Sequence, residues 1–174
     1  MKRAIAFAWL LALTTPAFAE APGDTAGPIT NQAQRDEIAT RVRDGQSCVH
    51  CDLFQIDLSY QDLGGRDFSG ARIRQSDLSL ATADRARFHG ANMSLANLFG
   101  ARLSGADLTD ANLNHATLVG AYLGGARMGG ASLSGANLSG AELDQAQGLT
   151  QAQLNAACGD SSTALPGGMT VPHC

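Results

Sequence analysis

The chain has 174 residues, a formal net charge of −4 and an aromatic content of only 5%. Its length suits one compact domain, and an acidic balance without a basic stripe argues against nucleic acid as a partner.

Residues 1–19 have the pattern of a cleaved signal peptide. Lys2 and Arg3 precede an apolar run over residues 4–13, and residues 17–19 read A-F-A, a typical cleavage site. Ten apolar residues cannot cross ~30 Å of hydrocarbon as a helix, and no cysteine follows the cut to carry a lipid. We therefore expect a periplasmic or secreted bacterial protein with no membrane contact after cleavage. Loss of the two positive charges of Lys2 and Arg3 lowers its net charge from −4 to −6.

Residues 20–50 follow the predicted signal peptide and precede the repeats. Residues 20–29 contain two prolines and two glycines, which predicts a flexible lead. Residues 30–50 are expected to form an N-terminal helical cap, because apolar Ile38 and Val42 are one helical turn apart and Gly45 follows as a stop signal.

Residues 51–147 repeat with a period of five. A large apolar residue recurs at every fifth position from Leu53 to Leu143, and Ala83 is the one exception among these nineteen centres. Alanine precedes the centre by two positions in each of the last thirteen units. A period of five fits neither the ~3.6 of a helix nor the ~2 of a strand, so it predicts a solenoid in which two of every five side chains point inward.

Four units would make a square coil of twenty residues, with successive coils ~4.8 Å apart. Ten of the nineteen units carry glycine two places after the centre, where a turn needs a residue that tolerates positive φ. Units such as Ala91-Asn92-Met93, Ala106-Asp107-Leu108 and Ala136-Asn137-Leu138 resemble the pentapeptide-repeat family, whose units read A-(D/N)-L-x-x. The resemblance implies an all-β solenoid, a right-handed quadrilateral β-helix, here of about 4.75 coils with short helical caps.

Two residues depart from the repeat pattern, and each departure leads to a structural prediction. Arg66 stands at an inward position of the first coil, and because an unpaired buried arginine is costly, we expect its side chain to turn to solvent. Ala83 stands at a centre, which predicts a local void or a pinched wall.

Residues 148–174 are expected to close the last coil with a cap helix and a disulfide-tied tail. Thr150 and Gln153 fit a capping box for a helix over about residues 151–157, which would lie on the last coil and explain why the repeat stops there.

Four cysteines in an exported protein predict disulfides, and four cysteines allow three pairings. Cys51 would lie on the first coil and Cys158 beyond the last, too far apart for the ~7 Å Cα limit of a disulfide. The solenoid therefore predicts the pairs Cys48 with Cys51 and Cys158 with Cys174.

The C-x-x-C spacing of Cys48 and Cys51 also permits a dithiol redox centre. Covalent haem would need a histidine where Asp52 stands, and a zinc site would need two further ligands. The other histidines are predicted on later coils or at the far end, so we expect no cofactor and no metal.

One outer face is unusually apolar. Leu80, Phe99 and Val119 fall at outward positions on adjacent coils, with Tyr60 and Leu95 near the margin. Such a patch can mark an interaction site, or its side chains can pack along the wall as satellites of the core. No serine has a histidine and an acid beside it in the lattice, so we expect no catalytic residue and no enzyme activity.

The leading functional hypothesis is a non-enzymatic, monomeric scaffold or protein-interaction module whose partner docks on this face or on an end cap. The alternative is a periplasmic redox protein that uses Cys48 and Cys51. A remote alternative comes from the resemblance, since quinolone-resistance members of the family resemble duplex DNA through an extended acidic surface and bind gyrase. Here one outer column instead alternates in sign, as Asp67, Arg87, Asp107 and Arg127.

Overall fold

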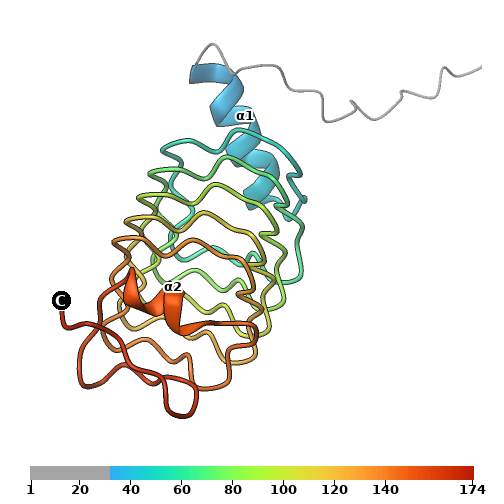
Figure 1. Cartoon of the computed structure of the whole chain (residues 1–174). Helices are drawn as coiled ribbons and strands as arrows, with labels where there is room; N and C mark the ends of the chain where they lie inside the picture. Colours follow the sequence, from blue (N-terminus) through green and yellow to red (C-terminus); the bar gives the residue numbers. More distant parts are fainter. Residues whose placement is uncertain (1–31) are drawn as a thin grey trace, which may run out of the picture.

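The computed structural model describes residues 32–174, so the predicted signal peptide and lead lie outside the described residues. Two helices stand at opposite ends of a coiled backbone, α1 (Gln32–Arg43) and α2 (Gln151–Asn155) (Figure 1). Between them, isolated parallel β-bridges join residues twenty apart, from Asp52↔Arg72 onward along the coil. Each turn of the solenoid therefore takes twenty residues.

The backbone of the coil is paired although it forms single bridges rather than long strands. The Asn97 N–H donates to Ser76 O at 2.9 Å on the preceding coil, and the Leu98 N–H donates to Thr117 O at 2.7 Å on the following coil. A third bond, from Ala101 N–H to Leu98 O at 3.1 Å, closes the turn. Repetition of these bonds satisfies the main chain without any strand longer than one bridge.

The backbone has a positive φ at every corner of the coil, including the corners that lack glycine. Every fifth residue from position 50 to position 140 has a positive φ, and nine of these residues are not glycine, with φ between 53 and 60°. The side chain that precedes such a corner holds it in place. The Oδ1 atom of Asp77 accepts the Ser79 N–H at 2.9 Å, and that of Asn97 accepts the Phe99 N–H at 3.2 Å. This Asx turn explains the Asp or Asn of the repeat unit.

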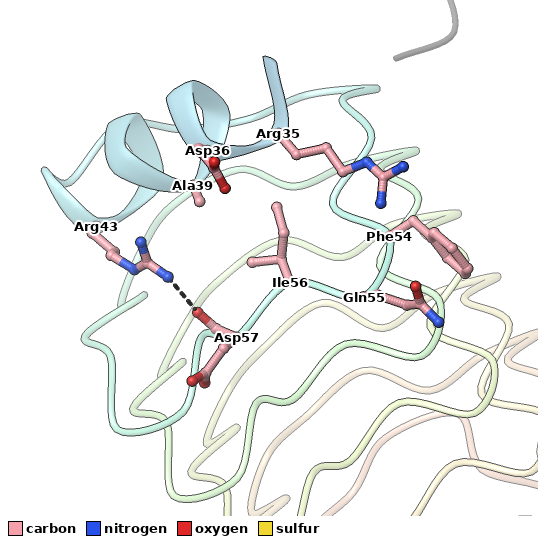
Figure 2. A pocket seen from close by; sticks show the side chains of 8 residues that line it. All are labelled: Arg35, Asp36, Ala39, Arg43, Phe54, Gln55, Ile56 and Asp57. Carbon is pink, nitrogen blue, oxygen red and sulfur yellow. Dashed lines mark hydrogen bonds between the residues drawn. The ribbon is translucent and has the colours of Figure 1, made fainter. Parts of the chain in front are cut away.

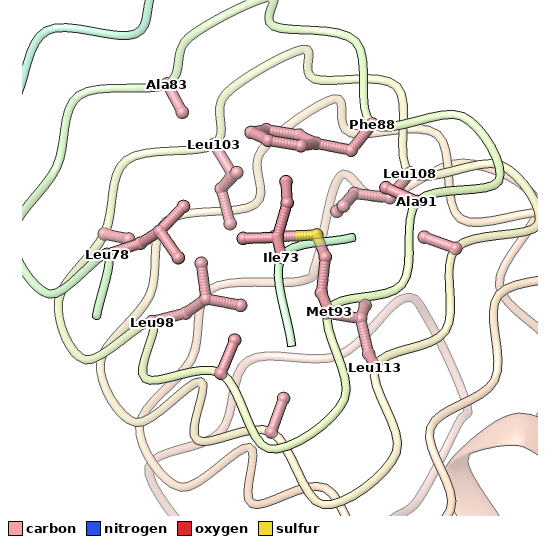
Figure 3. Close-up of a cluster of buried hydrophobic side chains, with 14 of the residues drawn as sticks. Ile73, Leu78, Ala83, Phe88, Ala91, Met93, Leu98, Leu103, Leu108 and Leu113 are labelled. Atoms are coloured by element: carbon pink, nitrogen blue, oxygen red, sulfur yellow. The ribbon is translucent and has the colours of Figure 1, made fainter. Parts of the chain in front are cut away.

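The interior contains the large centres and the alanines of the repeat (Figure 3). The Phe68 and Phe88 rings stack with centroids 5.3 Å apart. Ala83 and Phe88 are both buried on the same coil (Figure 3). The main-chain ladder continues there, since the Ala83 N–H donates to Arg102 O at 2.6 Å.

At the N-terminal end, α1 packs Ile38 and Val42 against the first coil. The expectation that Arg66 turns to solvent is wrong, because its side chain is half-buried beneath the end of α1. Its Nη1 donates to Val42 O at 3.4 Å and to Asp62 O. The last carbonyls of a helix lack internal donors, and the guanidinium provides one.

At the other end, α2 begins after Thr150 with the capping box in place, and its Leu154 is buried. The helix ends at Asn155, two residues before the predicted end. The tail then resumes the coil, with bridges Asn137↔Cys158 and Glu142↔Ala164. These bridges span 21 and 22 residues instead of twenty, so the tail forms an irregular continuation of the solenoid and not merely a tied extension.

Two disulfides lie at the two ends. Cys48 bonds to Cys51 with Cα atoms 5.5 Å apart, and Cys158 bonds to Cys174 with Cα atoms 4.8 Å apart. Neither helix within residues 32–174 has the length and hydrophobicity to cross a membrane.

Candidate interaction surface and N-terminal pocket

Each coil has four faces of five residues, which on the first coil are residues 51–55, 56–60, 61–65 and 66–70, and the same faces recur every twenty residues. The coil brings four apolar residues onto one corner, between the second and third faces. Main-chain bonds join their coils directly: the Leu80 N–H donates to Phe99 O at 2.8 Å and the Gly100 N–H to Val119 O at 2.9 Å. Tyr60 holds the same turn position as Leu80, one coil earlier. We call Tyr60, Leu80, Phe99 and Val119 the apolar corner.

The side chains of the apolar corner are open to solvent. Tyr60 is 75% exposed, Leu80 44% and Phe99 49%, while Val119 is half-buried. Leu80 reaches onto the next coil, because a Cβ atom on Gly100 would lie only 2.8 Å from Leu80 Cδ2. About half of the Leu80 and Phe99 surface is covered along the wall, and the other half is open to solvent.

Two further exposed apolar side chains lie on either side of this corner. Leu95 sits at the preceding corner of the coil, at the far margin of the second face. Tyr122 projects from the third face, in the column of Arg102 and Glu142. Sequence reasoning missed Tyr122, although an aromatic residue at the Asp or Asn position of the repeat was a visible signal.

Three of the four ion pairs among residues 32–174 lie on the faces that meet at the opposite corner. Arg72 pairs with Asp52 at 2.9 Å on the first face. On the fourth face Arg87 pairs with Asp67 at 3.1 Å, and a further pair of the same kind joins Arg127 to Asp107. A fourth pair, Arg102 with Asp84, lies on the third face, which borders the apolar corner, so compensated charges occur on both sides of the solenoid.

Hydrogen bonds favour the ionised form of the Asp67 and Asp107 carboxylates. The Ser69 hydroxyl, assisted by the Ser69 N–H and Arg87, lowers the pKa of Asp67. Partial burial alone would raise the pKa of Asp107, but bonds from Thr109 and Arg127 outweigh it, so that pKa is also lowered. The acidic side chains are thus engaged within the protein.

The cysteine pair considered for redox activity is shielded. Cys48 is only 3% exposed and Cys51 only 6%. Thiol–disulfide exchange needs an approachable sulfur, so this position favours a cross-link over a reactive centre. Cys174, at the other end, is exposed.

A pocket of 230 Å³ lies between α1 and the first coil (Figure 2). The sequence did not predict it, because it forms where α1 crosses the coil and no repeat signal marks that crossing. Among residues 32–174, no group of three or more His, Cys, Asp or Glu side chains is arranged to hold a metal ion. The pocket is lined by Arg35, Asp36, Ala39 and Arg43 of α1 and by Phe54, Gln55, Ile56 and Asp57 of the first coil.

A family described as pentapeptide repeats in eight copies matches residues 51–90, 62–98, 91–130 and 116–147. The chain belongs to the pentapeptide-repeat family. Its members form right-handed quadrilateral β-helices, in agreement with the twenty-residue coil described above. No curated protein sequence matches the chain.

Several solved pentapeptide-repeat proteins are similar to this one. A protein of the Arabidopsis thaliana thylakoid lumen is 31% identical, with a TM-score of 0.60 over 69% of this chain and 90% of that chain. Rfr23 of the cyanobacterium Cyanothece 51142 is 26% identical, with a TM-score of 0.38 over 75% and 98%. The plasmid-mediated fluoroquinolone resistance protein QnrB1 is 20% identical, with a TM-score of 0.36 over 65% and 74%.

Proposed function

We propose that this pentapeptide-repeat protein is an exported, non-enzymatic interaction module whose protein partner docks on the apolar corner. The observation that carries the proposal is the alignment of Tyr60, Leu80, Phe99 and Val119 over four successive coils. Scattered exposed apolar residues are ordinary on a protein surface, but a contiguous row is typical of an interface.

The shape of the apolar corner indicates the shape of the partner. The four residues lie on an outer corner of the rod and therefore form a convex ridge, about 14 Å long at the usual spacing between paired chains. A convex ridge is buried best in a concave apolar groove, such as the one between two packed helices. We expect the partner to provide such a groove.

Export is supported by three features. The two disulfides are typical of oxidising compartments. The first 19 residues have the composition of a signal peptide, and the relative that is 31% identical is a protein of the thylakoid lumen. Cleavage after Ala19 and a periplasmic or secreted location belong to this proposal.

The redox and topoisomerase alternatives have less support than the interaction module. The dithiol hypothesis requires accessible sulfurs, and those of Cys48 and Cys51 are buried. A role directed at a topoisomerase would use an uncompensated acidic surface, whereas Asp67 and Asp107 are each paired with arginine.

Replacement of Phe99 by Asp tests the proposal. The side chain is exposed, so the fold should persist, while a charge at the centre of the ridge should abolish capture of the partner from a cell-envelope extract. The matched control is His89→Asp, at the same turn position on the opposite corner, which should leave capture unchanged. Equal capture by wild type and Phe99→Asp would exclude the apolar corner as the docking surface.

A further inference from the structure

The chain ends in a short segment that covers the outer edge of the C-terminal tail. The Gly159 N–H donates to Pro172 O at 2.8 Å, and the Cys174 N–H donates to Gly159 O at 2.9 Å. Gly159 and His173 thus form a parallel bridge. These bonds satisfy a main-chain donor and acceptor that would otherwise be open at a sheet edge. We call residues 171–174 the terminal segment.

The terminal segment is held by few non-covalent contacts. Among residues 32–174, its main-chain hydrogen bonds go to Gly159 alone. Val171 is half-buried against Gly159, where an added Cβ atom would lie 2.7 Å from Val171 Cγ1. The three residues that follow Val171 are exposed. A chain end with so few buried contacts opens easily unless it is tied down.

The residue before the terminal segment is fixed independently of the disulfide. The Gln151 side chain of α2 donates from Nε2 to Thr170 O at 2.8 Å, and its Oε1 accepts the Thr170 N–H at 3.1 Å. Gln151 thereby anchors the backbone at Thr170. The part of the tail that can separate begins at Val171, directly after this anchor.

The Cys158–Cys174 disulfide ties the free end of the terminal segment to the solenoid. Cys158 belongs to the paired backbone, because its N–H donates to Ala136 O at 2.9 Å and its carbonyl accepts the Leu138 N–H at 2.7 Å. In the described part of the chain, the Cys174 main chain makes one hydrogen bond, to Gly159 O. Cleavage of the disulfide would therefore free Cys174 and leave Cys158 in place.

The Cys174 sulfur is approachable and lies on a polar turn. Cys174 is exposed, its Sγ accepts a hydrogen bond from the Ser139 hydroxyl at 3.5 Å, and Asn137 Oδ1 lies 3.3 Å from the same atom. The corresponding hydroxyl of Ser59 donates to the Asp57 carboxylate at 2.6 Å instead. At Ser139 the hydroxyl thus faces the sulfur, where it can stabilise the negative charge that develops during thiol–disulfide exchange.

We propose that the Cys158–Cys174 disulfide is a redox latch, which an external dithiol opens so that residues 171–174 leave the Gly159 edge. In this reaction the protein disulfide takes up two electrons and two protons and becomes two thiols. The dithiol loses them and forms a disulfide of its own.

The latch lies at one end of the apolar corner. Gly120 follows Val119 at that corner, and its N–H donates to Ser139 O at 2.9 Å on the next coil. Ser139 in turn contacts the Cys174 sulfur. Opening of the latch would change the surface beside Val119, but the latch itself does not depend on a partner at the apolar corner.

Amide hydrogen exchange of the ¹⁵N-labelled protein, measured by NMR, tests the latch with dithiothreitol as the dithiol. Alkylation and mass spectrometry establish the concentration that reduces only Cys158 and Cys174. There the Gly159 and Cys174 amides should exchange about tenfold faster or more, since they lose their acceptors. The Ala164 amide, which donates to Ala141 O at 2.9 Å, should keep its protection, because the rest of the tail stays folded.

Variants provide the same test without reductant. The double variant Cys158→Ser with Cys174→Ser lacks the disulfide and should show the fast Gly159 exchange in untreated protein. Gln151→Ala is the matched control, because it removes the Thr170 anchor but keeps the disulfide. In that variant the Gly159 amide should stay protected.

Three results would overturn the proposal. They are a latch disulfide that is reduced no earlier than Cys48–Cys51, unchanged Gly159 exchange after reduction of the latch, and loss of Ala164 protection together with that of Gly159. The last would show that the disulfide holds the whole tail and not a separate segment. Phe99→Asp should change neither reduction nor exchange, which distinguishes a failure here from a failure at the apolar corner.

Discussion

Ser76 is the only buried polar side chain among residues 32–174, and it stands in the inward column that alanine occupies on later coils. Its hydroxyl accepts the Ile56 N–H at 3.3 Å and donates to Leu53 O, which ties the first coil to the second. Repeat statistics would favour alanine at this position. The contacts predict the opposite, namely that Ser76→Ala lowers the free energy of unfolding by about 1 kcal/mol.

Urea denaturation measures this change. Ser134→Ala, at an exposed serine of a later coil, serves as the control and should change stability by less than about 0.5 kcal/mol. A Ser76→Ala protein as stable as wild type would mean that the alanine pattern outweighs the two hydrogen bonds.

Because the pKa of Asp67 is lowered in the folded protein, Asp67 makes the free energy of unfolding depend on pH. Because the Ser69 hydroxyl binds the ionised form, the folded pKa lies below the unfolded value of about 3.9. The stabilisation is therefore complete above about pH 4 and is lost as the pH falls through the folded pKa. Asp67→Asn keeps the turn acceptor without titrating, so its free energy of unfolding should fall less steeply than that of wild type between neutral pH and about pH 2. Parallel pH profiles for the two proteins would contradict this assignment.

At the scale of elements, Gln153 does more than cap its own helix. Its Oε1 accepts the Thr150 N–H at 2.8 Å, while its Nε2 donates to Met128 O and Ala131 O at 2.8 Å each. The side chain thus joins α2 to the last regular coil. We expect Gln153→Ala to destabilise the protein by about 2–3 kcal/mol, and Thr150→Ala, which removes only the N-cap, by about 1 kcal/mol.

Calorimetry measures which of these two variants is the less stable. Hydrogen exchange should in addition accelerate near residues 128–131 in Gln153→Ala but not in Thr150→Ala. The reverse order of stability would show that the capping box, and not the contact with the coil, fixes α2.

The two disulfides should differ in their response to mild reductant. Cys174 is exposed, whereas Cys48 and Cys51 are only 3% and 6% exposed. Alkylation followed by mass spectrometry should detect reduction of the Cys158–Cys174 bond first. Early and reversible reduction of Cys48–Cys51, at the potential of known oxidoreductases, would instead support the dithiol alternative.

The elements at the two ends of the solenoid show which local features the sequence predicts and which it does not. The helix after Thr150 was predictable because its capping residues are local, and the pairing of the cysteines followed from the length of the coil. Arg66 was misjudged because its partner, Val42 O, belongs to a helix end whose position over the coil no local signal fixes. The pocket beneath α1 was missed for the same reason.

At the scale of the molecule, a strict period determines which residues become neighbours. The five-residue repeat predicts that residues twenty apart stack, and hence that Leu80, Phe99 and Val119 lie together; the bridges agree with this register. The alternating charges of the Asp67 column follow from the same period, whereas the exposed Tyr122 was noticed only when all four faces were assembled.

The central claim is that the coil assembles a docking ridge from residues spread over sixty positions of sequence, from Tyr60 to Val119. Its most direct test is photo-crosslinking in the cell envelope, with benzoylphenylalanine placed singly at positions 60, 80, 99 and 119 and, as a control on the opposite corner, at position 89. We predict crosslinks to one common polypeptide from the four ridge positions and none from position 89. Crosslinks from position 89 to that polypeptide, or from the ridge positions to unrelated polypeptides, would contradict the account.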